Sequence, residues 1–168
     1  MRLTAIRDIK AGEELCITYC ALEYNFAADR QYSLPFDCVC NACQNAEMSD
    51  FRRRQIFSIN PWELVDAFYS WIKDGTTAYP GRLENLKNLI EEEGLEDSWW
   101  YRLVLKQMCG VGFAFDDEEV VMEYLQLLYK AFLAGGMTRD DVIDILEKAE
   151  CEYLPIIGVQ LGPGRRYW

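Results

Sequence analysis

The chain has 168 residues, 51% of them hydrophobic, and a formal net charge of −11, with its acidic excess after residue 57. This composition predicts one folded domain or two small ones, and the acidic excess argues against direct binding to nucleic acid. The sequence contains no histidine, which excludes catalytic pairs and zinc sites that need an imidazole. Seven cysteines and the lack of a long apolar run favour a soluble protein of the nucleus or cytoplasm with no membrane partner.

The predicted fold class is α+β and mostly α. Residues 1–20 are expected to form a β-hairpin, with a turn at Ala11 and Gly12 between two short strands. Residues 21–47 form a cysteine segment that begins with a short helix or turn followed by a loop. Residues 48–154 form an antiparallel helical domain of five or six helices, and residues 155–168 form an irregular tail.

Capping residues predict where the helices of residues 48–154 begin and end. Predicted helix starts lie at Ser49, Asn60 before Pro61, Asp97 or Ser98, Asp116 with Asp117, and Thr138 with Asp141. Predicted helix ends lie at Asp74 with Gly75, at Gly94, and at Gly135 with Gly136. We expect the three arginines at 52–54 on the exposed side of the first helix, and Trp62, Val65, Phe68 or Tyr69, and Ile72 on one face of the second.

Three thiols with the spacing of metal ligands follow Phe36 in Cys38-x-Cys40-x-x-Cys43. Thiolates prefer Zn²⁺ over hard cations, so this spacing predicts one zinc ion rather than three unligated thiols in a loop. A tetrahedral site needs a fourth ligand. The sequence leaves five choices open: Cys16, Cys20, Cys109, Cys151 and Asp37; Cys109 and Cys151 fit better as small core residues of helices.

Residues 7–19, Arg-Asp-Ile-Lys-Ala-Gly-Glu-Glu-Leu-Cys-Ile-Thr-Tyr, together with Phe36 and the three cysteines, closely resemble the end of a SET domain and its post-SET zinc segment. The closest likeness is to the SET and MYND-containing protein lysine methyltransferases and their fungal relatives, in which a tetratricopeptide-like helical domain follows. Two predicted helix pairs near Pro80 and Asp116 are offset by about 36 residues, close to the ~34 of that repeat.

The resemblance implies roles for five residues. Tyr19 is similar to the tyrosine that orients the substrate lysine beside the methyl donor, although its spacing alone would make it an ordinary core aromatic. Phe36 is similar to the aromatic that packs on the adenine of S-adenosylmethionine. Cys38, Cys40 and Cys43 match three zinc ligands of the family.

The family's fourth zinc ligand and part of its methyl-donor site come from an Asn-His-Ser-Cys-x-Pro-Asn segment that this sequence does not contain. We therefore expect this chain to be an inactive fragment by itself, with weak or sub-stoichiometric zinc binding unless Cys16 or Cys20 becomes the fourth ligand. Completed by a longer product, it would methylate a lysine of a histone or another protein. The alternative is a non-catalytic helical module whose acidic surface binds a basic protein segment.

Overall fold

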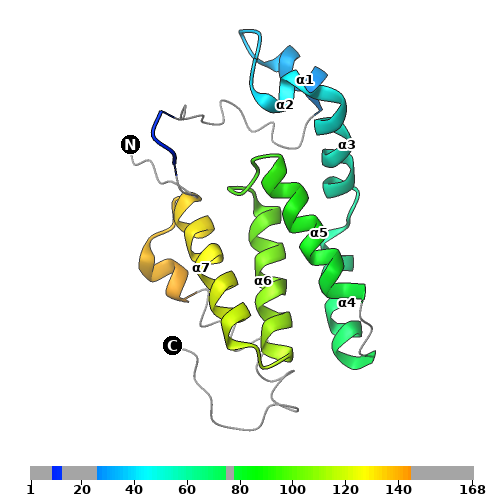
Figure 1. Cartoon of the computed structure of the whole chain (residues 1–168), viewed down its shortest axis with the longest axis vertical. Coiled ribbons are helices and arrows are strands. Elements are labelled where there is room, and N and C mark those ends of the chain that lie inside the picture. Colours follow the sequence, from blue (N-terminus) through cyan, green and yellow to red (C-terminus); the bar gives the residue numbers. More distant parts are fainter. Residues whose placement is uncertain (1–8, 13–25, 75–77, 145–168) are drawn as a thin grey trace.

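Helices dominate the part of the chain that the computed structural model describes, namely residues 9–12, 26–74 and 78–144 (Figure 1). The described helices are α1 (Ala27–Ser33), α2 (Asn41–Gln44), α3 (Ala46–Phe57), α4 (Pro61–Asp74), α5 (Ala78–Glu92), α6 (Trp99–Ala114) and α7 (Glu118–Ala134), and a further helical segment covers residues 139–144. The mostly α prediction is thus confirmed. No strand occurs in the described residues.

The predicted hairpin lies almost wholly outside the described residues. Its central turn is described, because Ala11 and Gly12 form a turn in which Gly12 has a φ of 84°, a backbone conformation that favours glycine. The predicted tail at 155–168 lies entirely outside the described residues. The tetratricopeptide-like order of the helices stays a prediction.

Local capping chemistry sets most helix ends where the sequence predicts them. The side chains of Asn60, Ser98 and Asp117 each accept a hydrogen bond from a backbone N–H in the first turn of α4, α6 and α7, at 3.0, 3.2 and 3.1 Å. At the start of the helical segment 139–144, the side chains of Thr138 and Asp141 each accept from the other's backbone N–H group. Gly94, with a φ of 66°, follows the end of α5.

The core lies among helices α4 to α7. Helix α6 packs between α5 and α7, and α4 covers the α5–α6 pair (Figure 1). A hydrogen-bonded tyrosine ties three of these helices together: the buried Tyr79 hydroxyl lies 3.1 Å from the carbonyl oxygen of Leu64 and 3.2 Å from Oε1 of Gln107. The fully or almost fully buried apolar side chains include Ile56, Leu64, Phe68, Leu83, Leu86, Ile90, Val104, Leu105, Val121 and Leu128.

Three sequence expectations about α3 and α4, one on a helix start and two on exposure, are wrong. Helix α3 begins at Ala46, so Ser49 lies inside the helix and is buried instead of capping it. Arg53 is also buried, because the carboxylate of Glu93, the residue after α5, pairs with it. Trp62 is 76% exposed, because α4 turns Leu64, Phe68 and Trp71 toward the core instead.

Helix α3 connects the cysteine segment to the helical domain. Among the helices α1 to α7, α1 and α2 pack only against each other and against α3, and α3 packs on α5. The α3–α5 contact contains a buried carboxylate: Glu93 accepts from the Ser49 hydroxyl at 2.6 Å and from Nε of Arg53 at 3.0 Å. Nη1 of Arg52 lies 3.3 Å from the same carboxylate. These groups fix the orientation of α3, and thereby of the cysteine segment, on the helical domain.

Candidate metal centre

The three predicted thiols come together in the structure. The Sγ atoms of Cys38, Cys40 and Cys43 all lie within 4.8 Å of one another. A tight turn produces this arrangement, because the carbonyl oxygen of Cys40 accepts from the backbone N–H of Cys43 at 3.0 Å and of Gln44 at 2.9 Å. Cys40 is the residue immediately before α2 and Cys43 lies in its single turn, so both thiols project to the same side as Cys38.

A glutamine from α1 holds the first cysteine in place. The side-chain amide of Gln31 donates to the carbonyl oxygen of Cys38 at 3.0 Å, and its carbonyl oxygen accepts from the Cys38 backbone N–H at 3.2 Å. The pair of bonds satisfies both backbone polar groups of Cys38. Helix α1 thus serves as a scaffold for the loop that carries this thiol.

The other end of α1 is fixed to α3. The backbone N–H of Ala27 donates to Oδ1 of Asp50 at 2.8 Å, and the guanidinium of Arg54 lies over the Phe26 ring at 5.2 Å from its centroid. The first bond satisfies an N–H group that has no partner within the helix. Together these contacts make α1, α2 and the start of α3 a small unit built around the thiols.

The thiols differ in their electrostatic surroundings. Burial raises the pKa of the Cys43 thiol to about 11, although the Arg30 guanidinium, whose Nη2 lies 3.8 Å from its Sγ, opposes that rise. Burial also acts to raise the pKa of Cys40, but hydrogen bonds from the Cys43 backbone N–H and from the neighbouring thiols outweigh it and lower the pKa overall. Cys40 is the exposed member of the three and therefore the one most accessible to an incoming ion.

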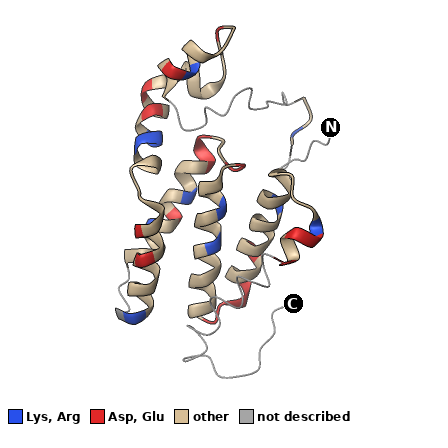
Figure 2. Ribbon diagram, turned by 180° about the vertical axis from the view of Figure 1, so that it is seen from behind, with Lys and Arg blue, Asp and Glu red and all other residues tan. Residues whose placement is uncertain are grey.

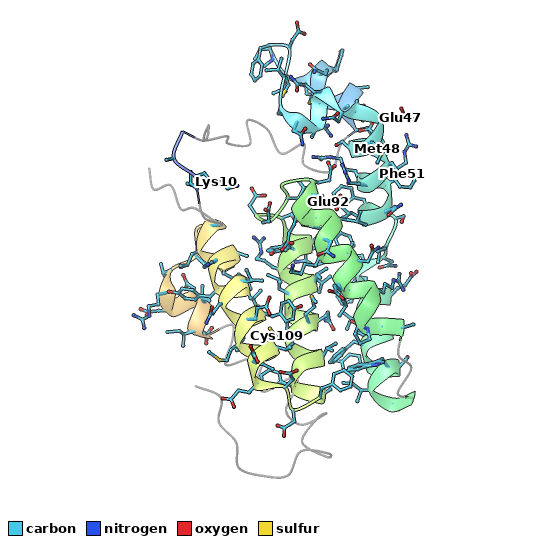
Figure 3. All side chains as sticks on the ribbon, in the orientation of Figure 1. Lys10, Glu47, Met48, Phe51, Glu92 and Cys109 are labelled. Atoms are coloured by element: carbon cyan, nitrogen blue, oxygen red, sulfur yellow. The ribbon has the colours of Figure 1, made fainter. Side chains whose placement is uncertain are left out.

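The donor set fits a metal ion. Three thiols this close together can bind one soft or borderline cation, and Zn²⁺ is compatible with them because it takes thiolate ligands at tetrahedral angles. Of the proposed fourth ligands, Asp37 and Cys109 are described, and neither belongs to the cluster. Cys109 is buried in α6, well away from the cysteine segment (Figure 3), which confirms it as a core residue. Cys16, Cys20 and Cys151 lie outside the described residues.

The resemblance assigns two residues, Tyr19 and Phe36, to a methyl-transfer site. Tyr19 lies outside the described residues. Phe36 is described, two residues before Cys38, and its side chain is 45% exposed. Of these two residues, the structure therefore describes Phe36 alone.

Sequence reasoning missed two residues of the centre, Arg30 and Gln31. They precede Cys43 and Cys38 by 13 and 7 residues, and they reach these cysteines only because α1 folds back on the loop that follows it. No spacing rule for metal ligands includes such residues. The one available signal was the short helix or turn expected at the start of the cysteine segment.

None of the helices in the described residues is both long and apolar enough to cross a lipid bilayer. Comparison with known proteins found no relative: no family model, no curated protein and no solved structure matches the chain.

Proposed function

We propose that the chain is the C-terminal part of a SET-domain protein lysine methyltransferase of the SET and MYND-containing type. The observation that carries this proposal is the cluster of three thiols, mounted on α3 directly before a helical domain. That order, a metal-binding cysteine segment followed by helices, is what the sequence resemblance implies. The full enzyme would transfer a methyl group from S-adenosylmethionine to a lysine of a histone or another protein in the nucleus or cytoplasm.

In this proposal the metal is a zinc ion with a structural role. Cys38, Cys40 and Cys43 would hold it, and a fourth ligand from outside the described residues would complete a closed tetrahedral site. The ion would connect the methyl-donor half of the enzyme to the helical domain. Phe36, which is 45% exposed, would contact the adenine of the donor by aromatic stacking.

Tyr19 would position the lysine amine through its hydroxyl. A group with an ordinary pKa near ~10 suits positioning and electrostatic stabilisation better than proton abstraction at neutral pH. Misplacement of a reacting group by about 1 Å can cost ~100-fold in rate. The tyrosine is therefore the residue whose loss should affect the reaction most directly.

The test begins with the transcripts that encode this chain. We expect an in-frame segment similar to Asn-His-Ser-Cys-x-Pro-Asn before Met1, and we expect the longer product to transfer labelled methyl groups to a protein lysine. In that product Tyr19→Phe should lower the rate by about 100-fold, whereas Tyr32→Phe, at a side chain that is 93% exposed, should not. A longer product whose rate is insensitive to Tyr19→Phe would contradict the proposal, as would transcripts without such a segment.

Two measurements on the 168-residue chain complete the test. Calorimetry with S-adenosylmethionine should show no saturable binding, and micromolar affinity would overturn the expectation that this chain is inactive alone. Elemental analysis should show weakly held zinc below one ion per chain. One tightly held ion would mean that a fourth ligand is present, and Cys20→Ser would then identify it by loss of metal.

A specific surface feature supports a second candidate, a helical module that binds a basic protein segment. Residues 116–119 are four consecutive exposed acidic residues at the α6–α7 turn (Figure 2), next to Phe115, which is 66% exposed. Acidic and aromatic side chains together suit lysine and arginine. A fluorescent Lys/Arg-rich peptide should then bind in a salt-dependent manner, and less tightly to Glu118→Gln/Glu119→Gln than to the control Glu84→Gln. Equal affinity for both variants would exclude this turn as the binding surface.

A further inference from the structure

An arginine lies beside the three thiols on the inner side of the cysteine segment. Arg30 belongs to α1, is only 8% exposed, and directs Nη2 to within 3.8 Å of the Cys43 Sγ atom. That separation is within the range of an N–H···S hydrogen bond.

The position of Arg30 is fixed by contacts on both sides of it. Three residues earlier, the backbone of Ala27 is bonded to Asp50 of α3, and one residue later the side chain of Gln31 brackets Cys38. The same short helix therefore holds one cysteine through its backbone and presents a cation to another. Such a built arrangement distinguishes Arg30 from a surface arginine that happens to lie near a thiol.

Arg30 also brings a positive charge next to the thiols. That charge reaches Arg53 as well, whose pKa is lowered first by burial and then by the charge of Arg30. Glu93 pairs with both Arg53 and Arg52, and the charge of Asp50 also acts to raise the pKa of Arg53. Three thiolates around a divalent cation carry one net negative charge, which is the charge that Arg30 can offset.

We propose that Arg30 is a positioning residue of the metal centre, which donates an N–H group to Cys43 Sγ and offsets the net negative charge of the thiolate-bound ion. This inference rests on the metal site described under Proposed function. Through this hydrogen bond, Arg30 would control the orientation of Cys43 as a ligand and the electron density on its sulfur. It also explains why α1 precedes the cysteines, since the helix supplies a second layer of contacts to the site.

The test compares four forms of the 168-residue chain: wild type, Arg30→Met, Arg30→Lys and Arg54→Met. Arg54→Met is the matched control, because it removes an exposed arginine that stacks on Phe26 at the same α1–α3 junction. Each form is titrated with Co²⁺, which absorbs through sulfur-to-cobalt charge transfer, and Zn²⁺ affinity is then measured by competition. Far-UV circular dichroism checks that each form is folded.

Arg30→Met should weaken both metals by about 10- to 100-fold, the usual effect of losing a partner that orients a ligand. Its charge-transfer band should move to lower energy, because a thiolate without its N–H donor gives up an electron more easily. Arg30→Lys should recover part of the affinity, and Arg54→Met should behave as wild type. A purely structural role for Arg30 would reduce the amount of metal bound without moving the band.

Two failures are distinguishable. Wild-type protein that gives no sulfur-to-cobalt band would refute the metal site, and this inference with it. Wild-type protein that binds Co²⁺ while Arg30→Met matches Arg54→Met in both affinity and band position would refute the role of Arg30 alone. If Arg30→Met does not fold, Arg30→Lys decides, because its altered donor geometry should shift the band, and an unshifted band would refute the role.

Discussion

Replacing Glu93 by glutamine should be among the most destabilising single changes in this protein. Glu93 contributes the carboxylate at the α3–α5 contact, and its side chain is 1% exposed while that of Arg53 is 5% exposed. The substitution keeps the size of the side chain and an acceptor for the Ser49 hydroxyl. It leaves the buried charge of Arg53 without its carboxylate, which is the costly outcome for a buried pair.

The expected magnitude follows from the distance. The Arg53 Nε and Glu93 Oε2 atoms are 3.0 Å apart, which corresponds to about 5–6 kcal/mol of attraction at an effective dielectric constant of ~20. Relaxation and entry of water reduce the loss to about 3–5 kcal/mol, the usual cost of removing one partner of a buried pair. A domain of this size has a total stability of roughly 5–15 kcal/mol, so the loss is a large fraction of it.

Urea unfolding followed by fluorescence of the buried Trp71 and Trp100 measures this loss. With a denaturant slope of about 2 kcal/mol per M, the midpoint of Glu93→Gln should fall by about 1.5–2.5 M. The neighbouring Glu92→Gln is the matched control: Glu92 also pairs with Arg52, at 2.7 Å, but its side chain is 55% exposed. Glu92→Gln should lower the free energy of unfolding by less than about 1 kcal/mol.

Equal losses in the two glutamine variants would refute the assignment of Glu93 as a buried, structurally required charge. A double replacement sharpens the test. Arg53→Met combined with Glu93→Leu removes both charges together, so it should recover most of the stability that Glu93→Gln loses. A double variant as unstable as Glu93→Gln would show that packing, and not the unpaired charge, causes the loss.

Two further predictions concern the helical domain. A Cβ atom at Gly112 would lie 2.8 Å from a side-chain carbon of Val121 on α7, so Gly112→Ala should lower the free energy of unfolding by about 1–3 kcal/mol. Gly81→Ala is the control, because a Cβ atom there meets nothing within 4 Å and should not destabilise the protein. Similar unfolding midpoints for the two variants would contradict the close approach of α6 and α7. Burial raises the pKa of Cys109 from 9.0 to about 12, so the stability it contributes is complete below pH 9 and is lost as the pH rises toward 12. Between pH 8.5 and 10.5 the wild type should therefore lose about 2 kcal/mol more than Cys109→Ala, and parallel pH profiles would refute this.

The features that sequence predicted correctly depend on neighbours in the chain. Asn60, Ser98 and Asp117 cap helices because their side chains bond to N–H groups two or three residues away. The clustering of the three thiols is equally local, since a single turn between Cys40 and Cys43 brings them together. Such patterns need no knowledge of the tertiary fold.

The features that were missed depend on contacts between distant residues. Arg53 looked exposed because it stands in a run of three arginines, and only Glu93, forty residues later, draws it inside. Ser49 resembled a capping residue because serine is common at helix starts. The true partner of its hydroxyl is again Glu93, which is distant in the sequence. Arg30 could not be assigned to the thiols from sequence because the return of α1 onto its own loop is a tertiary contact.

Among the described helices, α1 and α2 reach the helical domain only through α3, which has a consequence for how the protein opens. Helices α1 and α2 pack on nothing but each other and α3 among the seven described helices, so they can unfold without exposing the core of α4 to α7. Native-state opening should therefore divide the chain into two cooperative units, with the boundary at the Arg53–Glu93 pair. A bound metal ion would raise the hydrogen-exchange protection of the first unit toward that of the second, because it would cross-link the part of the structure with the smallest apolar core.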